Sequence, residues 1–365
     1  MKCYKNAYMH NFLRKYTVLV LALFAGMLVM ANEHTPAAND HNEKPFVVRE
    51  FILEHVGDSY IWHITKIGNT ELYVPLPVIV YSQQSGLHVF MASEFHHTGS
   101  YNGFYISGSE ANKGKIVEVV NGKEVRPFDI SITKNVFTLL LSAGLLIFII
   151  IYVATAYKRK GFFVKNKFVL FVEMMVMMIN DDVIKPCIGK DYRKYAPYLL
   201  TLFFFILINN LMGVIPVFPF GANLTGNIAF TLILALITFV IVNVSGTKEY
   251  WREIFWPDVP LALKFPIPFL PLIELIGVFT KPFALMIRLL ANMLAGHSIM
   301  LGLLSLIFVT VSLGHAANIS LSATSLLLSI FISFVELLVA FIQAYIFTLL
   351  SAVYIGLARI EPHHK

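Results

Sequence analysis

The chain has 365 residues, of which 57% are hydrophobic and 14% are charged, and its formal net charge is +6 at pH 7. A mean hydropathy of +0.70 excludes a soluble globular protein and indicates a polytopic membrane protein. The basic residues lie mostly at the ends of apolar runs, where positive charge orients membrane spans. A nucleic-acid partner is therefore not expected.

Residues 1–31 have the pattern of a cleaved export signal. A basic region is followed by an apolar run from Thr17 to Met30 and by a small-residue cleavage site that ends at Ala31. The alternative is an uncleaved first span, but this run is shorter than the about twenty residues that a span needs. If the signal is cleaved, Cys3 leaves with it. Cys187 then remains alone, and no internal disulfide can form.

Residues 32–130 are polar and rich in turns, with short alternating stretches such as Tyr60–Ile64 and Leu72–Val74. This pattern predicts a small β-rich domain, which would be extracytoplasmic because it follows an export signal. Seven of the twelve histidines lie here, including His96 and His97. No pair has the spacing of a known ligand motif, so we predict surface histidines and no metal site.

Residues 131–365 are predicted to form an all-α membrane domain with about five transmembrane helices and one interfacial helix. The interfacial helix is expected at 165–190, although a helix packed inside the protein is the alternative. The last two helices are too long for an upright span, so they must tilt or bend, and Pro271 and Pro282 are positions for kinks. Residues 314–318 are expected to link them outside the membrane. The five spans are predicted at about 135–157, 196–215, 226–246, 268–313 and 321–358.

Basic clusters follow the spans on one side of the membrane. Lys158, Arg159 and Lys160 end the first span, Lys248 and Arg252 follow the third, and the C-terminal tail is basic. The positive-inside rule therefore predicts an external N-terminus and a cytoplasmic C-terminus in the bacterial inner membrane.

Charged and amide residues interrupt the apolar helix at 268–313. Glu274, Lys281 and Arg288 are seven residues apart and share one stripe of a helix, and Asn292 lies within about 40° of Arg288. An arginine inside a span costs roughly 2.5–3.5 kcal/mol, so it marks a functional face. The alternative is an interfacial salt bridge between Glu274 and Lys281, with Arg288 reaching the headgroups. His297 falls about 140° from Asn292 and, taken alone, is more often a packing residue.

The final helix carries Glu336 and Gln343, which are seven residues apart and share a face. A carboxyl and an imidazole such as His297 can form a proton relay, since both groups gain and lose protons. The alternative for Glu336 is a partner that only holds two helices together. Ionisable groups on two apolar helices favour an ion pathway.

The segment Lys281–His297, with Arg288 at its centre, resembles the signature of subunit a of the rotary ATP synthases. Three further matches are Glu274 fourteen residues before Arg288, the stretch Asn209–Pro216, and Glu336 with Gln343 on the last helix. The resemblance covers about residues 135–360. It implies a membrane stator that faces a ring of c subunits and assembles with peripheral-stalk b subunits and a catalytic head. It implies neither a cofactor nor catalysis by this chain.

The chain departs from many family members at two positions. His297 and Glu336 exchange the usual glutamate and histidine, as in the mitochondrial type, which favours their being partners. Gly213 replaces the aspartate that often follows the Asn-Leu-Met stretch, so Asn210, Asn223 and His297 would have to hold the water of the entry path.

The mechanism implied by the resemblance has two aqueous half-channels. One runs from outside past Asn210, His297 and Glu336 to a c-ring carboxylate, and the other runs from the cytoplasm past Glu274. Arg288 separates them, Gln343 positions its guanidinium, and Asn292 binds water nearby. Whether the coupling ion is H⁺ or Na⁺ is decided largely by the c subunit.

Two other classes of function compete with this interpretation. A secondary transporter could use Arg288 to bind an anion, but such folds contain internal repeats, and none is visible. An intramembrane enzyme could use His297 and Glu336, but no His-Glu-x-x-His or comparable cluster accompanies them. The chain also lacks the Gly-x-x-x-x-Gly-Lys-Ser/Thr loop that binds nucleotide phosphates.

Overall fold

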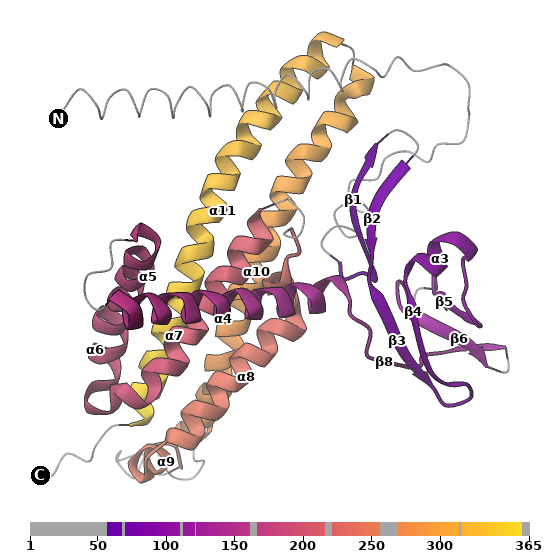
Figure 1. The fold of residues 1–365 in the computed structure, drawn as a ribbon. Helices are drawn as coiled ribbons and strands as arrows, with labels where there is room; N and C mark the ends of the chain where they lie inside the picture. The colour runs from indigo at the N-terminus through magenta and orange to yellow at the C-terminus, as the bar shows by residue number, and fades with distance from the viewer. Residues whose placement is uncertain are drawn as a thin grey trace, which may run out of the picture. The chain divides into compact units, whose positions relative to one another are not determined.

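The computed structural model describes residues 57–359 except for 68–69, 110–111, 121, 161–165, 216–220, 256–268 and 314. Short strands occupy the chain before residue 130, and long helices occupy it afterwards (Figure 1). The predicted fold class, a helical membrane protein with a small β-rich region, is confirmed. The expected export signal at 1–31 and Cys3 lie outside the described residues.

The β-rich region contains three small antiparallel sheets. One pairs β1 with β2, the second has the order β4-β3-β8, and the third has the order β5-β6-β7. The alternating stretches at Tyr60–Ile64 and Leu72–Val74 do form strands, as predicted. The strands and the short helix are β1 (Ile61–Ile67), β2 (Thr70–Pro75), β3 (Pro77–Ser82), β4 (Gly86–Met91), α3 (Ser93–Thr98), β5 (Phe104–Ile106), β6 (Ile116–Val120), β7 (Lys123–Val125) and β8 (Phe128–Asp129).

The core of this region forms between the second and third sheets. Val78 and Val80 of β3 pack with Phe90 of β4, Phe104 of β5 and Ile116 of β6. The Phe90 and Phe104 rings lie 6.5 Å apart, a separation at which aromatic pairs stabilise each other.

Five helical segments are long and apolar enough to cross a membrane, at Lys134–Arg159, Lys167–Val214, Ile228–Ser245, Leu272–Ile307 and Asn318–Ala358. Each overlaps one of the five predicted spans, but the second also includes residues 167–190, which were expected to form an interfacial helix. The helices are α4 (Lys134–Lys160), α5 (Lys167–Met178), η1 (Ile179–Ile184), α6 (Lys185–Ile188), η2 (Gly189–Asp191), α7 (Tyr192–Val214), η3 (Leu224–Gly226), α8 (Ile228–Ser245), α9 (Lys248–Phe255), α10 (Phe269–Val309), η5 (Thr310–Leu313) and α11 (His315–Ala358).

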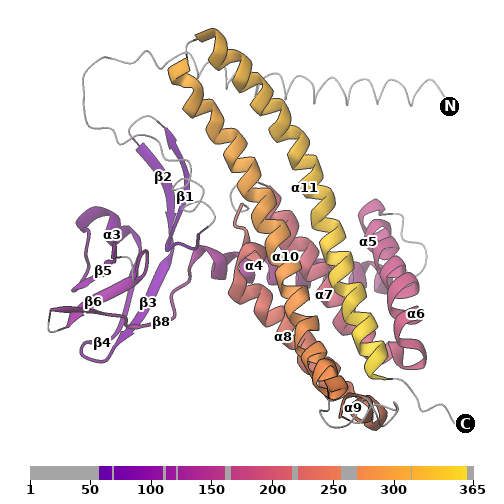
Figure 2. The same cartoon turned by 180° about the vertical axis from the view of Figure 1, so that it is seen from behind.

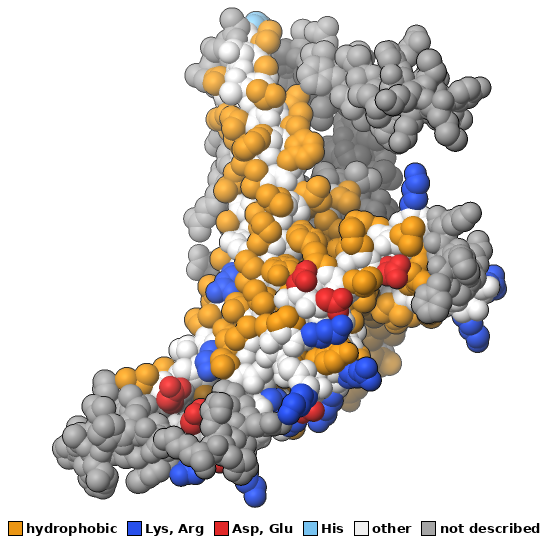
Figure 3. Space-filling model, turned by 90° about the vertical axis from the view of Figure 1, so that its left-hand side faces the viewer, with side chains coloured by type: hydrophobic (Ala, Val, Ile, Leu, Met, Phe, Trp, Pro, Cys, Tyr) orange, Lys and Arg blue, Asp and Glu red, His pale blue; other side chains and the backbone are white. Residues whose placement is uncertain are grey.

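The two longest helices, α10 and α11, lie side by side and run in opposite directions (Figures 1 and 2). α7 packs against α11, and α8 packs against α10, so that a buried apolar core forms among the four. Gly356 allows α11 to approach α6 closely, because a Cβ at this position would collide with the backbone carbonyl of Cys187. Along the long helices, Figure 3 shows mostly hydrophobic side chains, with the charged side chains gathered lower in the view.

The last third of the chain differs from the sequence-based expectation at the junction between α10 and α11. The predicted linker at 314–318 is wrong, because α11 already begins at His315. The turn is held by Asn318, whose side-chain oxygen accepts hydrogen bonds from Thr310 at 2.8 Å and from Ser322 at 3.2 Å. Before this junction, α10 runs without interruption through Pro282.

Candidate functional site

One face of α10 carries the charged residues that the sequence predicts to be functional. Glu274, Arg288 and Asn292 are exposed on it, and Lys281 is half-exposed. Within the described part of the chain, no carboxylate forms an ion pair with Arg288. A fixed positive charge therefore stands on the outer surface of an apolar helix.

The opposite side of α10 carries His297, which is 8% exposed. The predicted angular separation of His297 from Asn292 is thus confirmed, since one is buried and the other is exposed. Glu336 of α11 is also 8% exposed and lies against Gly296, the residue before His297. A Cβ built on Gly296 would lie 2.6 Å from Oε1 of Glu336, so the glycine makes room for the carboxyl. Oε2 of Glu336 is buried and has no hydrogen-bond partner.

Gln343 of α11 is buried at the level of Arg288. The contact between Gly296 and Glu336 sets the register of the antiparallel pair. Arg288 lies eight residues before Gly296, and Gln343 lies seven residues after Glu336, so the two differ in height by only about 1.5 Å. The sequence motif therefore brings an amide and a guanidinium to the same level on neighbouring helices.

Asn210 joins α7 to α11. Its Nδ2 donates a 3.0 Å hydrogen bond to the backbone carbonyl of Ala340, which lies between Glu336 and Gln343. The side chain is fully buried, yet its Oδ1 has no partner. A buried amide oxygen without a partner is costly and is a binding position for water.

Asn223 holds the turn η3 against α10. Its Nδ2 donates to the backbone carbonyl of Met293 at 3.0 Å, and its Oδ1 accepts from the backbone N–H of Gly226 at 2.9 Å. Both ends of the amide are thus used within the protein. Of the two asparagines predicted to line the entry path, Asn210 is the one whose side-chain oxygen accepts no hydrogen bond.

Two protein-family models match different parts of the chain. The family model described as ATP synthase A chain matches residues 136–356, more than half of the chain. The chain belongs to the ATP synthase A chain family. A separate family, described as a domain of unknown function, matches residues 51–135.

Curated relatives within the ATP synthase A chain family are similar over the same part of the chain. ATP synthase subunit a 2 of Chlorobaculum tepidum is 45% identical over 237 residues, which are 64% of this chain and 65% of the relative. ATP synthase subunit a of Chlorobium phaeobacteroides is 43% identical over 243 residues, 65% of this chain and 68% of the relative. ATP synthase subunit a of Myxococcus xanthus is 39% identical over 242 residues, 65% of this chain and 75% of the relative. The chain thus spans about two thirds of the length of these relatives.

The structure adds site residues that the sequence analysis missed. Asn209 Oδ1 and Thr225 Oγ1 are buried without partners beside the two predicted asparagines. The doublet Asn209-Asn210 in an apolar helix was a signal for the first. Gly296 lies inside the segment Lys281–His297, but its contact with Glu336 depends on the register of α10 and α11.

A stripe of polar side chains on α11 was also missed. Asn318, Ser322, Ser325, Ser329 and Ser333 precede Glu336 at spacings of three and four, which keeps them within about 80° of arc. The stripe faces α10, because Ser325 donates to the backbone carbonyl of Leu303. Ser329 Oγ is buried without a partner, seven residues from Glu336. The spacing alone could have revealed this stripe.

Lys281 lines a small pocket among α8, α9, α10 and α11. Its ammonium lies 5.8 Å from the centre of the Tyr354 ring, within cation–π range. Asn243 and Tyr250 line the same pocket, and Asn243 Oδ1 has no partner. Burial raises the pKa of Tyr250, and the nearby negative charge of Glu274 adds to this increase. The proposed salt bridge between Glu274 and Lys281 does not occur among the ion pairs of the described residues.

The described part of the chain contains no cluster of candidate metal ligands. There, no three His, Cys, Asp or Glu side chains gather closely enough to hold a metal ion.

Proposed function

We propose that this chain is the proton-translocating stator subunit of a rotary ATP synthase. The supporting observation is the division of α10 into two sides. Arg288 is exposed without an ion pair on one side, while His297 and Glu336 are buried on the other. The relatives are named as ATP synthase subunit a, which agrees with this function.

The buried side supplies the outer half of the proton path. Asn210 Oδ1 and Glu336 Oε2 are buried acceptors without partners. Asn210 of α7 contacts α11, and Glu336 of α11 contacts α10. Water that satisfies these acceptors would connect Asn210 with the carboxyl of Glu336 and the imidazole of His297. Asn223 keeps the turn η3 in place beside this path, since both ends of its amide are used.

The exposed side supplies the electrostatic barrier. Each c subunit presents one carboxyl to Arg288 as the ring turns, and a guanidinium that stays protonated favours the ionised form of that carboxyl. A charge pair at 4 Å is worth about 4 kcal/mol at an effective dielectric of about 20. The same charge repels a hydrated proton that would cross directly between the half-channels. Gln343, at the height of Arg288, orients the guanidinium, and Asn292 binds water beside it.

The other half of the path begins at Glu274. This carboxylate is exposed on α10, two helical repeats of seven residues before Arg288. It would accept protons released from the ring and pass them to the cytoplasm. The partners in this model are the c-ring, the b subunits of the peripheral stalk, the catalytic head and membrane lipid.

We place the chain in the bacterial inner membrane with its N-terminal domain, residues 32–130, outside and its C-terminus in the cytoplasm. The support is the distribution of Lys and Arg, which follow the first and third spans and the last helix. Residues 1–31 would act as the export signal, and the membrane domain would begin at residue 131. The chain would perform no chemistry on ATP, because it contains no phosphate-binding loop.

The test is ATP-driven acidification of inverted membrane vesicles that carry the assembled complex with Arg288→Ala. We expect acidification to be lost while the complex remains assembled, because removal of the charge removes the barrier and the release of the ring carboxyl. A matched control is Arg252→Ala on α9, whose side chain is 69% exposed and only 3.9 Å from Glu249. It should acidify vesicles as the wild type does. Unchanged pumping with Arg288→Ala would overturn the proposal and return a transporter to consideration.

A further inference from the structure

The sheet β4-β3-β8 presents a continuous apolar surface to the outside. The strand registers place Leu87 and Phe128 on either side of Tyr81, and Val89 beside Ile79. The exposed fractions run from 44% for Met91 to 68% for Phe128. We call this surface the outer sheet face and define it by Tyr81, Leu87, Val89, Met91, Phe128 and Ile130.

This sheet is apolar on both faces, since its inner face contributes Val78, Val80 and Phe90 to the core and its outer face is also apolar. Ser82 and Ser131 are 1% and 6% exposed, whereas their neighbours Tyr81 and Ile130 are 51% and 58% exposed. The buried serines are paired, because Ser82 donates to Glu118 and Ser131 bonds to the backbone of Ile79. An antiparallel sheet on a solvated surface places polar residues outside. The outer sheet face therefore has the composition of a surface that is covered.

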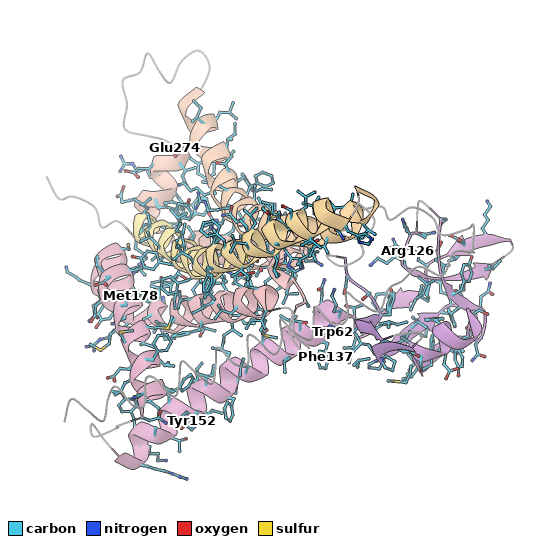
Figure 4. The ribbon with its side chains drawn as sticks, turned by 90° about the horizontal axis from the view of Figure 1, so that it is seen from above. Trp62, Arg126, Phe137, Tyr152, Met178 and Glu274 are labelled. Atoms are coloured by element: carbon cyan, nitrogen blue, oxygen red, sulfur yellow. The ribbon has the colours of Figure 1, made fainter. Side chains whose placement is uncertain are left out.

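The sheet is joined directly to the beginning of a membrane span. The backbone N–H of Ile132 donates to Pro77 of β3 at 3.1 Å, and that of Lys134, the first residue of α4, donates to Ser59 at 2.9 Å. The Trp62 ring of β1 meets the Phe137 ring of α4 at 5.8 Å and nearly at a right angle (Figure 4). The strands are thus fixed where α4 enters the membrane.

Because the sheet is joined to the beginning of α4, lipid is the partner most compatible with the outer sheet face. From β8 into α4, Phe128, Ile130, Val136 and Leu140 are exposed and apolar, so exposed apolar residues continue along the chain from the sheet into a candidate membrane span. None of the six residues of the outer sheet face is charged. Beside Phe128, Arg126 lines a groove with Tyr81, where a guanidinium can meet a headgroup phosphate.

The unpaired edges of the sheet limit how deeply it can insert into the membrane. β4 and β8 are the edge strands of this sheet, and their outer backbone groups cannot enter hydrocarbon unsatisfied. The apolar side chains can still reach the boundary between headgroups and acyl chains, as in other interfacial elements. We propose that the outer sheet face rests on the membrane leaflet in which α4 begins, with its side chains in that boundary.

Site-directed spin labelling of the assembled complex in liposomes tests this proposal. Val89→Cys is labelled with a nitroxide in a background without Cys3 and Cys187, and collision with oxygen is compared with collision with a water-soluble nickel complex. The matched control is Val119→Cys on β6, which is 58% exposed in a different sheet. We expect oxygen to dominate at residue 89 and the nickel complex to dominate at residue 119.

Two results would overturn the proposal. A label at residue 89 that is as accessible to the nickel complex as the label at residue 119 would mean that the face meets water. A label that is protected from both reagents would mean that a protein covers it. ATP-driven pumping by the labelled complex shows that both variants are assembled, and it tests the stator function separately.

Discussion

Two carboxylates, Glu124 in the β-rich region and Glu336 in the helical bundle, differ in how completely they are bonded. Glu124 of β7 accepts hydrogen bonds from Tyr105 at 3.0 Å, Ser107 at 2.9 Å, Ser109 at 2.7 Å and Asn112 at 3.1 Å. These donors tie the loop after β5 to β7. Such a saturated carboxylate has no acceptor left for water or a proton carrier, so its role is to hold the fold.

Glu336 in the bundle shows the opposite arrangement. Glu336 is 8% exposed, and one of its oxygens has no partner, as is also the case for the Oδ1 atoms of Asn209 and Asn210. Leaving a buried polar group without a partner costs about 1–3 kcal/mol. A fold retains such a group when water or a proton completes its bonding. The contrast separates carboxylates that stabilise the structure from those that are available for transport.

Among substitutions of these carboxylates, the largest effect on transport is expected for Glu336→Gln. The amide fits the space beside Gly296 but cannot exchange a proton, so a relay through this position is interrupted. We expect ATP-driven pumping in inverted vesicles to fall on the order of 10²-fold. Assembly should be unchanged, because the amide preserves the packing between α10 and α11.

An exchange variant sharpens this prediction. His297→Glu combined with Glu336→His keeps one imidazole and one carboxyl in the same buried place. We expect the double variant to pump better than either single variant, because the relay regains both types of group. Additive losses in the double variant would show that the two residues do not act as partners.

A smaller effect is expected for Gly296→Ala. The new methyl group would lie 2.6 Å from Oε1 and 3.1 Å from Cγ of Glu336, so the carboxyl must move. Overpacking of this kind costs typically about 1–3 kcal/mol. We expect pumping to fall by roughly tenfold, as the displaced carboxyl loses its alignment, and this is measured in the same vesicle assay.

Gly302→Ala is the control for this effect. It lies in the same helix, where alanine should gain about 0.5–1 kcal/mol over glycine, and a Cβ there meets no heavy atom within 4 Å. Pumping should therefore remain normal. Shortening the carboxyl with Glu336→Asp in the Gly296→Ala background should restore part of the activity. Equal losses for both glycines would assign the effect to the helix and not to Glu336.

The spans and the two sides of α10 were predictable from the sequence because both depend on local pattern. An uncharged run that ends at Lys158–Lys160 marks α4. The helical period of 3.6 residues places Arg288 and His297 on opposite sides of α10. The β-strands of the N-terminal region followed from alternation in the same way.

Contacts between distant segments were not predictable. The bond from Asn210 to Ala340 spans 130 residues, and that from Asn223 to Met293 spans 70 residues. Each depends on the register of packed helices, which no local period specifies. The linker at 314–318 was misassigned because Gly314 and Asn318 are typical of loops. Asn318 lies in α11, where it bonds Ser322 and also Thr310 of η5.

The smallest effect on pumping is expected for Glu124→Gln, the counterpart of Glu336→Gln in the β-rich region. Hydrogen bonds from Asn112, Ser109 and Ser107 lower the pKa of Glu124 to about 2 from its ordinary 4.5. A lowered pKa stabilises the fold above the ordinary value, and this stabilisation is lost as pH falls from about 4.5 towards 2. The glutamine variant should lack this dependence.

Hydrogen exchange in residues 104–125 of the reconstituted complex measures this difference. With intrinsic exchange rates corrected, wild-type protection should decline between pH 5 and 3, whereas Glu124→Gln should already be less protected at pH 5 and change less in this window. Residues 77–91, in a different sheet, serve as the internal reference. Pumping at neutral pH should stay normal, because Glu124 belongs to a saturated cluster outside the bundle. A loss of pumping with intact assembly would mean that saturated bonding does not distinguish structural carboxylates from those used in transport.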